Sequence, residues 1–250
     1  MDTNELEQRP SVEVVGRGAT DINWGLRNYM IRVFNHMGLG LLLTAAVAWF
    51  VANNESMFNL LYKNDPQYGY SMSVLGWVVA LAPLVMVFAF NYVLRTKSLA
   101  TVQMMFWLFS AVMGASLASL FLLYTAASMT RVFLITAATF GAMSLYGYTT
   151  QRDLTKLGSF LFMGLIGLII ASIVNIFMQS SALYWALSYI GVAIFVGLTA
   201  FDVQKIKENY YAMHHSEEMA HKAAVSGALS LYLDFINLFI YLLRIMGDRR

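Results

Sequence analysis

The chain has 250 residues, of which 59% are hydrophobic and 12% are charged. Because soluble domains carry about 25% charged residues, this composition predicts a membrane protein with several spanning segments. The formal net charge is only +2 and the basic residues are scattered, so a nucleic-acid partner has no support. The absence of cysteine excludes a disulfide framework, a thiol nucleophile and a cysteine-based zinc site.

Residues 1–30 are polar, and they lack the apolar core and small-residue cleavage site of a signal peptide. We therefore expect a cytoplasmic N-terminal segment at residues 1–30, followed by a single transmembrane domain at residues 31–250. Neither part contains a phosphate-binding glycine loop, a paired-histidine zinc motif or a serine-hydrolase elbow. Nucleotide-binding and hydrolase functions therefore have no support in the sequence.

Seven apolar stretches approach the roughly 20 residues that a spanning helix needs, with charged or polar breaks between them. They cover residues 33–52, 74–94, 101–123, 132–148 and 157–178, a sixth stretch that begins near Tyr184, and residues 225–243. The sequence therefore predicts an all-α integral membrane protein with seven transmembrane helices.

Lysine and arginine are enriched in short cytoplasmic loops, so their distribution predicts the orientation in the membrane. One side would carry Arg9, Arg17, Arg27, Arg32, Arg95, Lys97, Arg152, Lys156, Lys205, Lys207 and Lys222. The other side would carry Lys63 and Arg131, which places the N-terminus in the cytoplasm. The basic tail with Arg244, Arg249 and Arg250 then lies on the unexpected side. Either the tail is tolerated there or the last segment is re-entrant, and its full spanning length favours seven complete spans.

Two aspartates interrupt apolar sequence, where ionisable side chains are costly and usually functional. Asp202 ends the uncharged run of residues 157–201, and Asp234 lies alone within the last apolar stretch. If the sixth helix continues beyond Asp202, antiparallel packing brings the two carboxylates to a similar depth. Two carboxylates close together in a low dielectric tend to share one proton. When both are ionised, their oxygens suit Ca²⁺ better than a soft metal.

Each aspartate also has a structural interpretation. Asp202 could be an interfacial ion-pair partner of Lys205, three residues further along the same helix. Asp234 could be a neutral carboxyl in a hydrogen bond between helices, with Asn237 as a supporting polar group on the same face. Arg95, at the end of the second stretch, is a candidate counter-ion for either aspartate, although a snorkelling arginine is the usual role at that position.

Three segments carry a resemblance to a known family. They are MSLYGYTTQRDL at residues 143–154, GLTAFDVQKIK at residues 197–207 and LYLDFINLF at residues 231–239. Together they resemble the Bax inhibitor-1 (TMBIM) family, and its bacterial branch most closely, over the chain from about Arg27 to the C-terminus. One departure is that Pro83 and Leu84 stand where some members carry an acidic residue.

The resemblance implies a fold in which the seventh helix is surrounded by the other six, and a pH-sensitive calcium leak across the bacterial inner membrane. It further implies that Asp202 and Asp234 form a di-aspartyl proton sensor and calcium site, and that Arg95 exchanges with this pair during gating. The expected partners are the lipid bilayer, calcium as the transported ion and protons. Neither a cofactor nor a nucleotide is expected.

Two other functions remain open at this stage. The chain could be a non-conducting regulatory protein that binds a membrane protease or a stress or cell-death partner, through its N-terminal segment or its last loop. It could also be an intramembrane aspartyl protease, because two aspartates on adjacent helices are what that chemistry requires. The protease is disfavoured because Tyr232 and Leu233 precede Asp234, where such enzymes carry a glycine-containing motif. We therefore expect a protein that is not an enzyme.

Overall fold

The computed structural model describes residues 11–65, 69–212 and 217–249, and it is almost entirely helical. The helices and strands, in chain order, are α1 (Ser11–Asn53), α2 (Glu55–Leu61), β1 (Tyr62–Asp65), β2 (Gly69–Met72), α3 (Val74–Thr96), α4 (Leu99–Leu117), α5 (Leu120–Leu123), α6 (Ala126–Thr149), α7 (Thr155–Met178), α8 (Ser181–Ala212) and α9 (Glu217–Met246). Among the described residues, seven helical segments are long and apolar enough to cross a membrane, which confirms the all-α fold with seven spans.

The expected boundary between residues 30 and 31 falls inside an unbroken helix. α1 runs from Ser11 to Asn53, and its spanning part begins at Trp24. Leu26, Tyr29 and Met30 are buried in the main hydrophobic core. The bundle therefore includes residues that polarity alone assigned to the N-terminal segment. Residues 1–10 lie outside the described part of the chain.

A small structure between the first two spans was not predicted. Asn54 caps α2 by accepting a hydrogen bond from the Met57 backbone N–H, and β1 pairs with β2 as an antiparallel hairpin. Ser73 then caps α3 through the backbone N–H of Gly76. α2 and the hairpin are too short to show a clear hydrophobic period, but α2 and α3 each begin with a side-chain cap from a polar residue.

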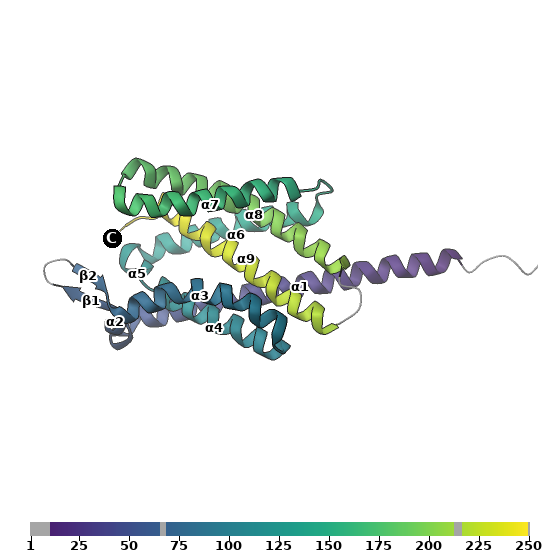
Figure 1. Cartoon of the computed structure of the whole chain (residues 1–250), viewed down its shortest axis with the longest axis horizontal. Helices are drawn as coiled ribbons and strands as arrows, with labels where there is room; N and C mark the ends of the chain where they lie inside the picture. Colours follow the sequence, from purple (N-terminus) through teal and green to yellow (C-terminus); the bar gives the residue numbers. More distant parts are fainter. Residues whose placement is uncertain (1–10, 66–68, 213–216, 250) are drawn as a thin grey trace, which may run out of the picture.

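α9 is the most buried of the seven spans and lies in the middle of the bundle, between α3 and α4 on one side and α7 and α8 on the other (Figure 1). It packs directly against α1, α4, α6 and α8. α3 and α7 face it across a cavity that is described below. The expected central position of the last helix is therefore confirmed, with four neighbours in close packing and two at a distance.

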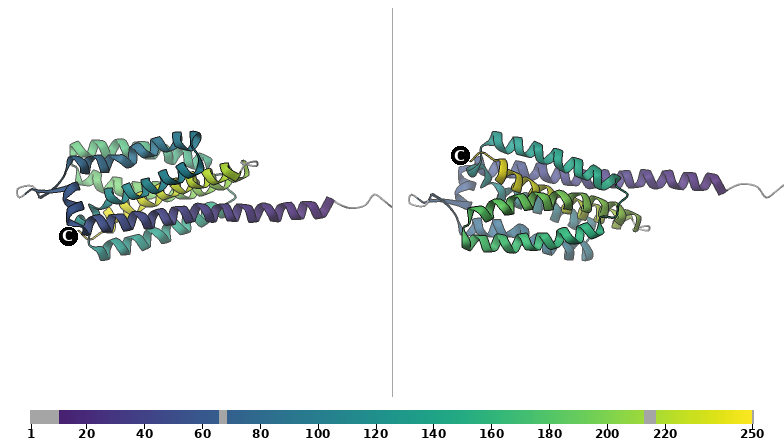
Figure 2. Two further views of the ribbon diagram at one scale, coloured as in Figure 1. Left: turned by 90° about the horizontal axis from the view of Figure 1, so that it is seen from below. Right: turned by 90° about the horizontal axis from the view of Figure 1, so that it is seen from above.

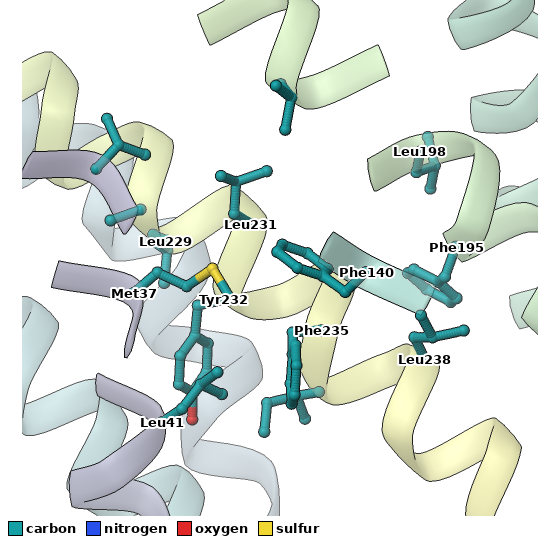
Figure 3. Close-up of a cluster of buried hydrophobic side chains, with 14 of the residues drawn as sticks. Met37, Leu41, Phe140, Phe195, Leu198, Leu229, Leu231, Tyr232, Phe235 and Leu238 are labelled. Carbon is teal, nitrogen blue, oxygen red and sulfur yellow. The ribbon is translucent and has the colours of Figure 1, made fainter. Parts of the chain in front are cut away.

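The core is built around the apolar side chains of α9. Figure 3 shows Tyr232 and Phe235 extending from α9 toward its neighbours, with Phe140 of α6 beside Phe235. The rings of Phe140 and Phe235 meet edge to face at 5.4 Å between centroids, a favourable aromatic geometry. The Tyr232 hydroxyl lies 2.6 Å from the Thr44 hydroxyl of α1, so this buried polar group has a partner. These contacts fix α9 to α1 and α6.

The start of α1 and the end of α9 lie at opposite ends of the bundle, as an odd number of spans requires (Figure 2). α9 is one uninterrupted helix of 30 residues, so the re-entrant alternative for the last segment is wrong. The basic tail is held locally. Asp248 forms a 2.9 Å ion pair with Arg131, and an Arg249 guanidinium nitrogen donates to the Tyr184 hydroxyl at 2.9 Å.

α6 and α8 approach each other closely at a glycine. Gly147 is buried, and a Cβ atom at this position would collide with the backbone carbonyl of Ala200 on α8. Gly141, on the same helix, has open space around the corresponding position. Small residues at helix contacts allow the close backbone packing on which membrane bundles rely. Gly147 and Gly141 therefore serve as the test position and the control position for this helix contact.

We expect Gly147→Ala to destabilise the protein by about 1–3 kcal/mol, because the added methyl group forces α6 and α8 apart. Gly141→Ala should be neutral or stabilising by up to about 1 kcal/mol, because alanine favours helix and meets no neighbour. Thermal unfolding of the purified variants in one detergent measures the difference. Equal melting temperatures for the two variants would contradict the assigned contact.

Candidate functional site

A cavity of about 1230 Å³ lies between α3, α7, α8 and α9. Along α7 its lining extends from Gly158 to Ile176. At a rise of 1.5 Å per residue this distance is about 27 Å, close to the roughly 30 Å thickness of the hydrocarbon core of a bilayer. The cavity therefore follows almost the whole depth of the membrane.

The cavity opens toward lipid between α3 and α7. α7 packs mainly against α8, and α3 packs mainly against α4, so neither helix closes on the other. In Figure 1 they lie on opposite sides of α9. The α7 residues Phe162, Met163 and Ile173 line the cavity and are also more than half exposed. We call this cavity the lateral groove.

α9 presents a polar stripe to the lateral groove. Its lining residues on this helix include Ser230, Asp234, Asn237, Tyr241 and Arg244, which follow each other at intervals of four and three residues. Residues with this spacing share one face of an α-helix. The stripe gives an otherwise apolar groove a row of polar groups from its middle to the end near the C-terminus.

The lateral groove brings the two predicted aspartates together. Asp202 of α8 and Asp234 of α9 both line it, and their carboxylates are close enough to interact electrostatically. Asp234 is only 5% exposed, and its Oδ2 atom has no hydrogen-bond partner among the described residues. A buried carboxylate oxygen without a partner is costly to keep. A proton or a cation bound in the groove would reduce this cost.

The contacts bear differently on the structural interpretations of the two aspartates. Lys205 interacts electrostatically with Asp202 but forms no ion pair with it, and the Lys205 ammonium lies over the Phe201 ring at 5.8 Å. Within the described chain, ion pairs join only Arg131 to Asp248 and Lys222 to Glu218. Asn237 lines the groove as expected, and its amide donates at 2.8 Å to the Leu233 carbonyl of its own helix.

Arg95 does not meet the aspartates in this structure. It lies exposed in the last turn of α3 and is absent from the lining of the lateral groove. Its exchange with the aspartate pair stays a prediction. Leu84 does line the groove, next to the buried Pro83. α3 therefore contributes an apolar wall to the groove at this position.

The oxygen atoms in the groove favour a weak cation site over a tight one. Ca²⁺ in proteins takes six to eight oxygen ligands, and two carboxylates offer four oxygens. Among the described residues, no group of three or more acidic, histidine or cysteine side chains is placed to hold a metal. The aspartate pair can therefore attract a hard cation without trapping it, which suits an ion in transit better than a resident metal.

Gln204 braces the helix that carries Asp202, and sequence reasoning did not identify it. Its side-chain oxygen accepts a 2.8 Å hydrogen bond from the Leu154 backbone N–H, and its amide donates at 2.8 Å to the Arg152 carbonyl. Leu154 precedes α7 and supplies no side-chain cap of its own. Gln204 thus replaces a missing cap and fixes α8 to the α6–α7 turn. No local pattern predicts a contact across this sequence distance.

The sequence did not lead us to predict the polar stripe of α9 as a whole. Only Asp234 and Asn237 were singled out, whereas Ser230, Tyr241 and Arg244 belong to the same face. Here a signal was available, because the spacing of four and three residues is readable in the sequence. Tyrosine and serine carry no formal charge, and a search for ionisable groups passes over them.

Comparison with known proteins supports the resemblance noted in the sequence. The family model described as "Inhibitor of apoptosis-promoting Bax1" matches residues 26–250. The inner membrane protein YbhL of Escherichia coli strain K12 is 47% identical over 90% of this chain and 94% of its own length. A Rickettsia prowazekii protein is 46% identical over 90% of this chain and 92% of its own, and a Caulobacter vibrioides protein is 42% identical over 94% of both.

We expect Gln204→Leu to lower stability, because it leaves the Leu154 N–H and the Arg152 carbonyl without their partner at a cost of about 1–3 kcal/mol for each group. Cleavage by trypsin after Arg152, exposed in the α6–α7 turn, and after Lys156, exposed in the first turn of α7, should become faster. Gln151→Leu, at an exposed position of the same turn, is the control. Equal cleavage rates for the two variants would show that Gln204 is not a brace.

Proposed function

The chain belongs to the Bax inhibitor-1 family, and we propose that it is a pH-sensitive calcium leak pathway of the cytoplasmic membrane. The observation that carries this proposal is the pairing of Asp202 and Asp234 in a groove that follows the depth of the bilayer. Most other wall positions are apolar, so a cation in the groove is stabilised most strongly beside the aspartates.

Protons and calcium would compete for the same oxygens. In a low-dielectric groove two adjacent carboxylates do not both ionise cheaply, and a shared proton relieves their repulsion. A divalent cation relieves the same repulsion only when both carboxylates are ionised. The occupancy of the pair by calcium then depends on pH, which is the basis of the proposed sensor.

Arg95 is proposed as a counter-ion in another state of the protein. The end of α3 that carries it lies at the same end of the bundle as Lys205, three residues from Asp202. Entry of its guanidinium into the groove would neutralise the aspartate pair and exclude a cation. Because Arg95 is exposed and has no ion pair in the described chain, such a movement breaks no salt bridge.

An enzymatic role is not part of the proposal. An aspartyl protease needs two carboxylates that both face a water and a peptide bond. Here Tyr232, which precedes Asp234 by two residues, points to the other side of α9 and packs edge to face on Phe106 and Phe109. No cofactor is proposed, and calcium enters only as the transported ion.

The asparagine variants of the aspartates test the sensor. In liposomes that contain a calcium dye, we expect Asp202→Asn and Asp234→Asn to abolish the pH dependence of calcium flux, because the amide binds no proton in this range. The double variant should behave like either single variant, since the function belongs to the pair. Calcium flux with unchanged pH dependence in both single variants would refute the mechanism.

Asp153→Asn is the matched control. Asp153 is exposed in the α6–α7 turn at the same end of the bundle, outside the spans. Hydrogen bonds from the hydroxyl and backbone N–H of Thr155 lower the pKa of its carboxyl, so it stays ionised throughout the neutral range. Its replacement should leave the pH dependence of flux unaltered.

We also propose that the N-terminus lies in the cytoplasm. The ends of α3 and α8, with Lys97, Lys205 and Lys207, share one end of the bundle with the start of the first span. Lys63 lies in the hairpin at the opposite end. Since basic residues concentrate on the cytoplasmic side, this distribution supports a cytoplasmic N-terminus.

The cysteine-free sequence makes this orientation testable. In intact cells we expect an impermeant maleimide to label Lys63→Cys and not Lys97→Cys, both of which are at exposed positions. After the membrane is opened, both variants should be labelled. Labelling of Lys97→Cys alone in intact cells would reverse the assigned orientation.

A further inference from the structure

The end of the lateral groove farthest from the aspartates has a different character. There it is lined by Asn175 and Ile176 near the end of α7, Tyr184 near the start of α8, and Arg244 in the last turns of α9. Asp234 precedes Arg244 by about 15 Å along the helix axis, at 1.5 Å per residue. The aspartate pair is therefore too far away to neutralise Arg244.

Arg244 is a half-buried cation without a carboxylate partner in the described chain. Its guanidinium lies 5.6 Å from the ring centroid of Tyr184 and 5.1 Å from that of Tyr241. Asp248, the nearby acidic residue of the tail, is engaged by Arg131. The aromatic rings orient the guanidinium through cation–π contacts, but they do not balance its charge.

A second cation lies beside the first. The Arg249 guanidinium is 5.7 Å from the same Tyr184 ring and donates a hydrogen bond to its hydroxyl. Two guanidinium groups therefore flank one tyrosine at this end of the lateral groove. Trp185, the next residue of α8, is 44% exposed, in keeping with the aromatic residues that mark the level of lipid headgroups.

The wall beside this cationic end faces hydrocarbon. Ile169, Ile173 and Ile176 of α7 line the groove and are each at least half exposed. Because α3 and α7 do not close on each other, a lipid chain reaches this wall without crossing any packed interface. A phospholipid has a charged headgroup and apolar acyl chains. The pair of cations matches the headgroup, and the apolar surface that opens to the bilayer matches the acyl chains.

We propose that the C-terminal end of the lateral groove binds an anionic phospholipid, with the phosphate against Arg244 and an acyl chain along α7. Guanidinium binds phosphate through charge-assisted, bidentate hydrogen bonds. The two unbalanced arginines favour a lipid of net negative charge over a zwitterionic one, whose own ammonium would neutralise the phosphate. The site does not depend on calcium transport, and the proposal stands apart from that function.

The test uses the purified full-length protein, stripped of lipid in a neutral detergent. Phosphatidylglycerol and phosphatidylcholine with the same acyl chains are titrated, and the melting temperature and lipid adducts in native mass spectra are recorded. We expect tighter binding of phosphatidylglycerol. Arg244→Gln should weaken that binding by about tenfold or more, because a charge-assisted hydrogen bond is lost.

Two further variants separate the site from general charge. Arg244→Lys keeps the charge but loses bidentate geometry, so its affinity should fall between those of the parent and Arg244→Gln. Lys63→Gln removes an exposed lysine of the hairpin at the same end of the bundle and should leave affinity unchanged. Circular dichroism establishes that each variant is folded.

Three outcomes would overturn the proposal. They are equal affinity for the two lipids, equal affinity of Arg244→Gln and Lys63→Gln, and the same stabilisation by inorganic phosphate as by phosphatidylglycerol. The last result would mean that the acyl chain contributes nothing and that the site is a simple phosphate site.

Discussion

The bundle is organised by one constraint, which is that the carboxyl group of Asp234 cannot face hydrocarbon without a large cost in desolvation. α9 must therefore lie where other helices shield it, and it is the most buried span. Its apolar side chains, such as Phe235 and Leu238, fill the core against α6 and α8. Its polar stripe faces the lateral groove.

The groove separates acidic and basic groups along its length. Asp202 and Asp234 place two carboxyl groups in its middle and toward one end, and Arg244 places a guanidinium at the other. They are too far apart to neutralise each other, and no ion pair in the described chain satisfies any of them. In a low-dielectric surrounding such charges attract counter-ions. The carboxylates favour protons and hard cations, whereas Arg244 favours an anionic group.

Parts of this structure follow from the sequence and others depend on contacts between distant residues. The seven spans were predictable because each is set by its own apolar length, and Asp202 and Asp234 were found because charge in such sequence is rare. Gln204 and Gly147 acquire their roles only from partners on other helices, Leu154 and Ala200. α2 and the hairpin were missed because short elements show no clear period, and the stripe of α9 because most of its members are uncharged.

The two sides of α9 differ in what a movement would cost. On one side the Tyr232 hydroxyl meets Thr44 and its ring packs on Phe106 and Phe109, so displacing α9 breaks a buried hydrogen bond and aromatic contacts. On the other side α7 packs mainly against α8 and is the least buried span, so its displacement breaks contacts with fewer helices. Widening of the groove therefore costs less free energy at α7 than at α9. The aspartate pair lies on α8 and α9, so a displacement of α7 alone would change the lipid-facing wall without changing the geometry of the pair.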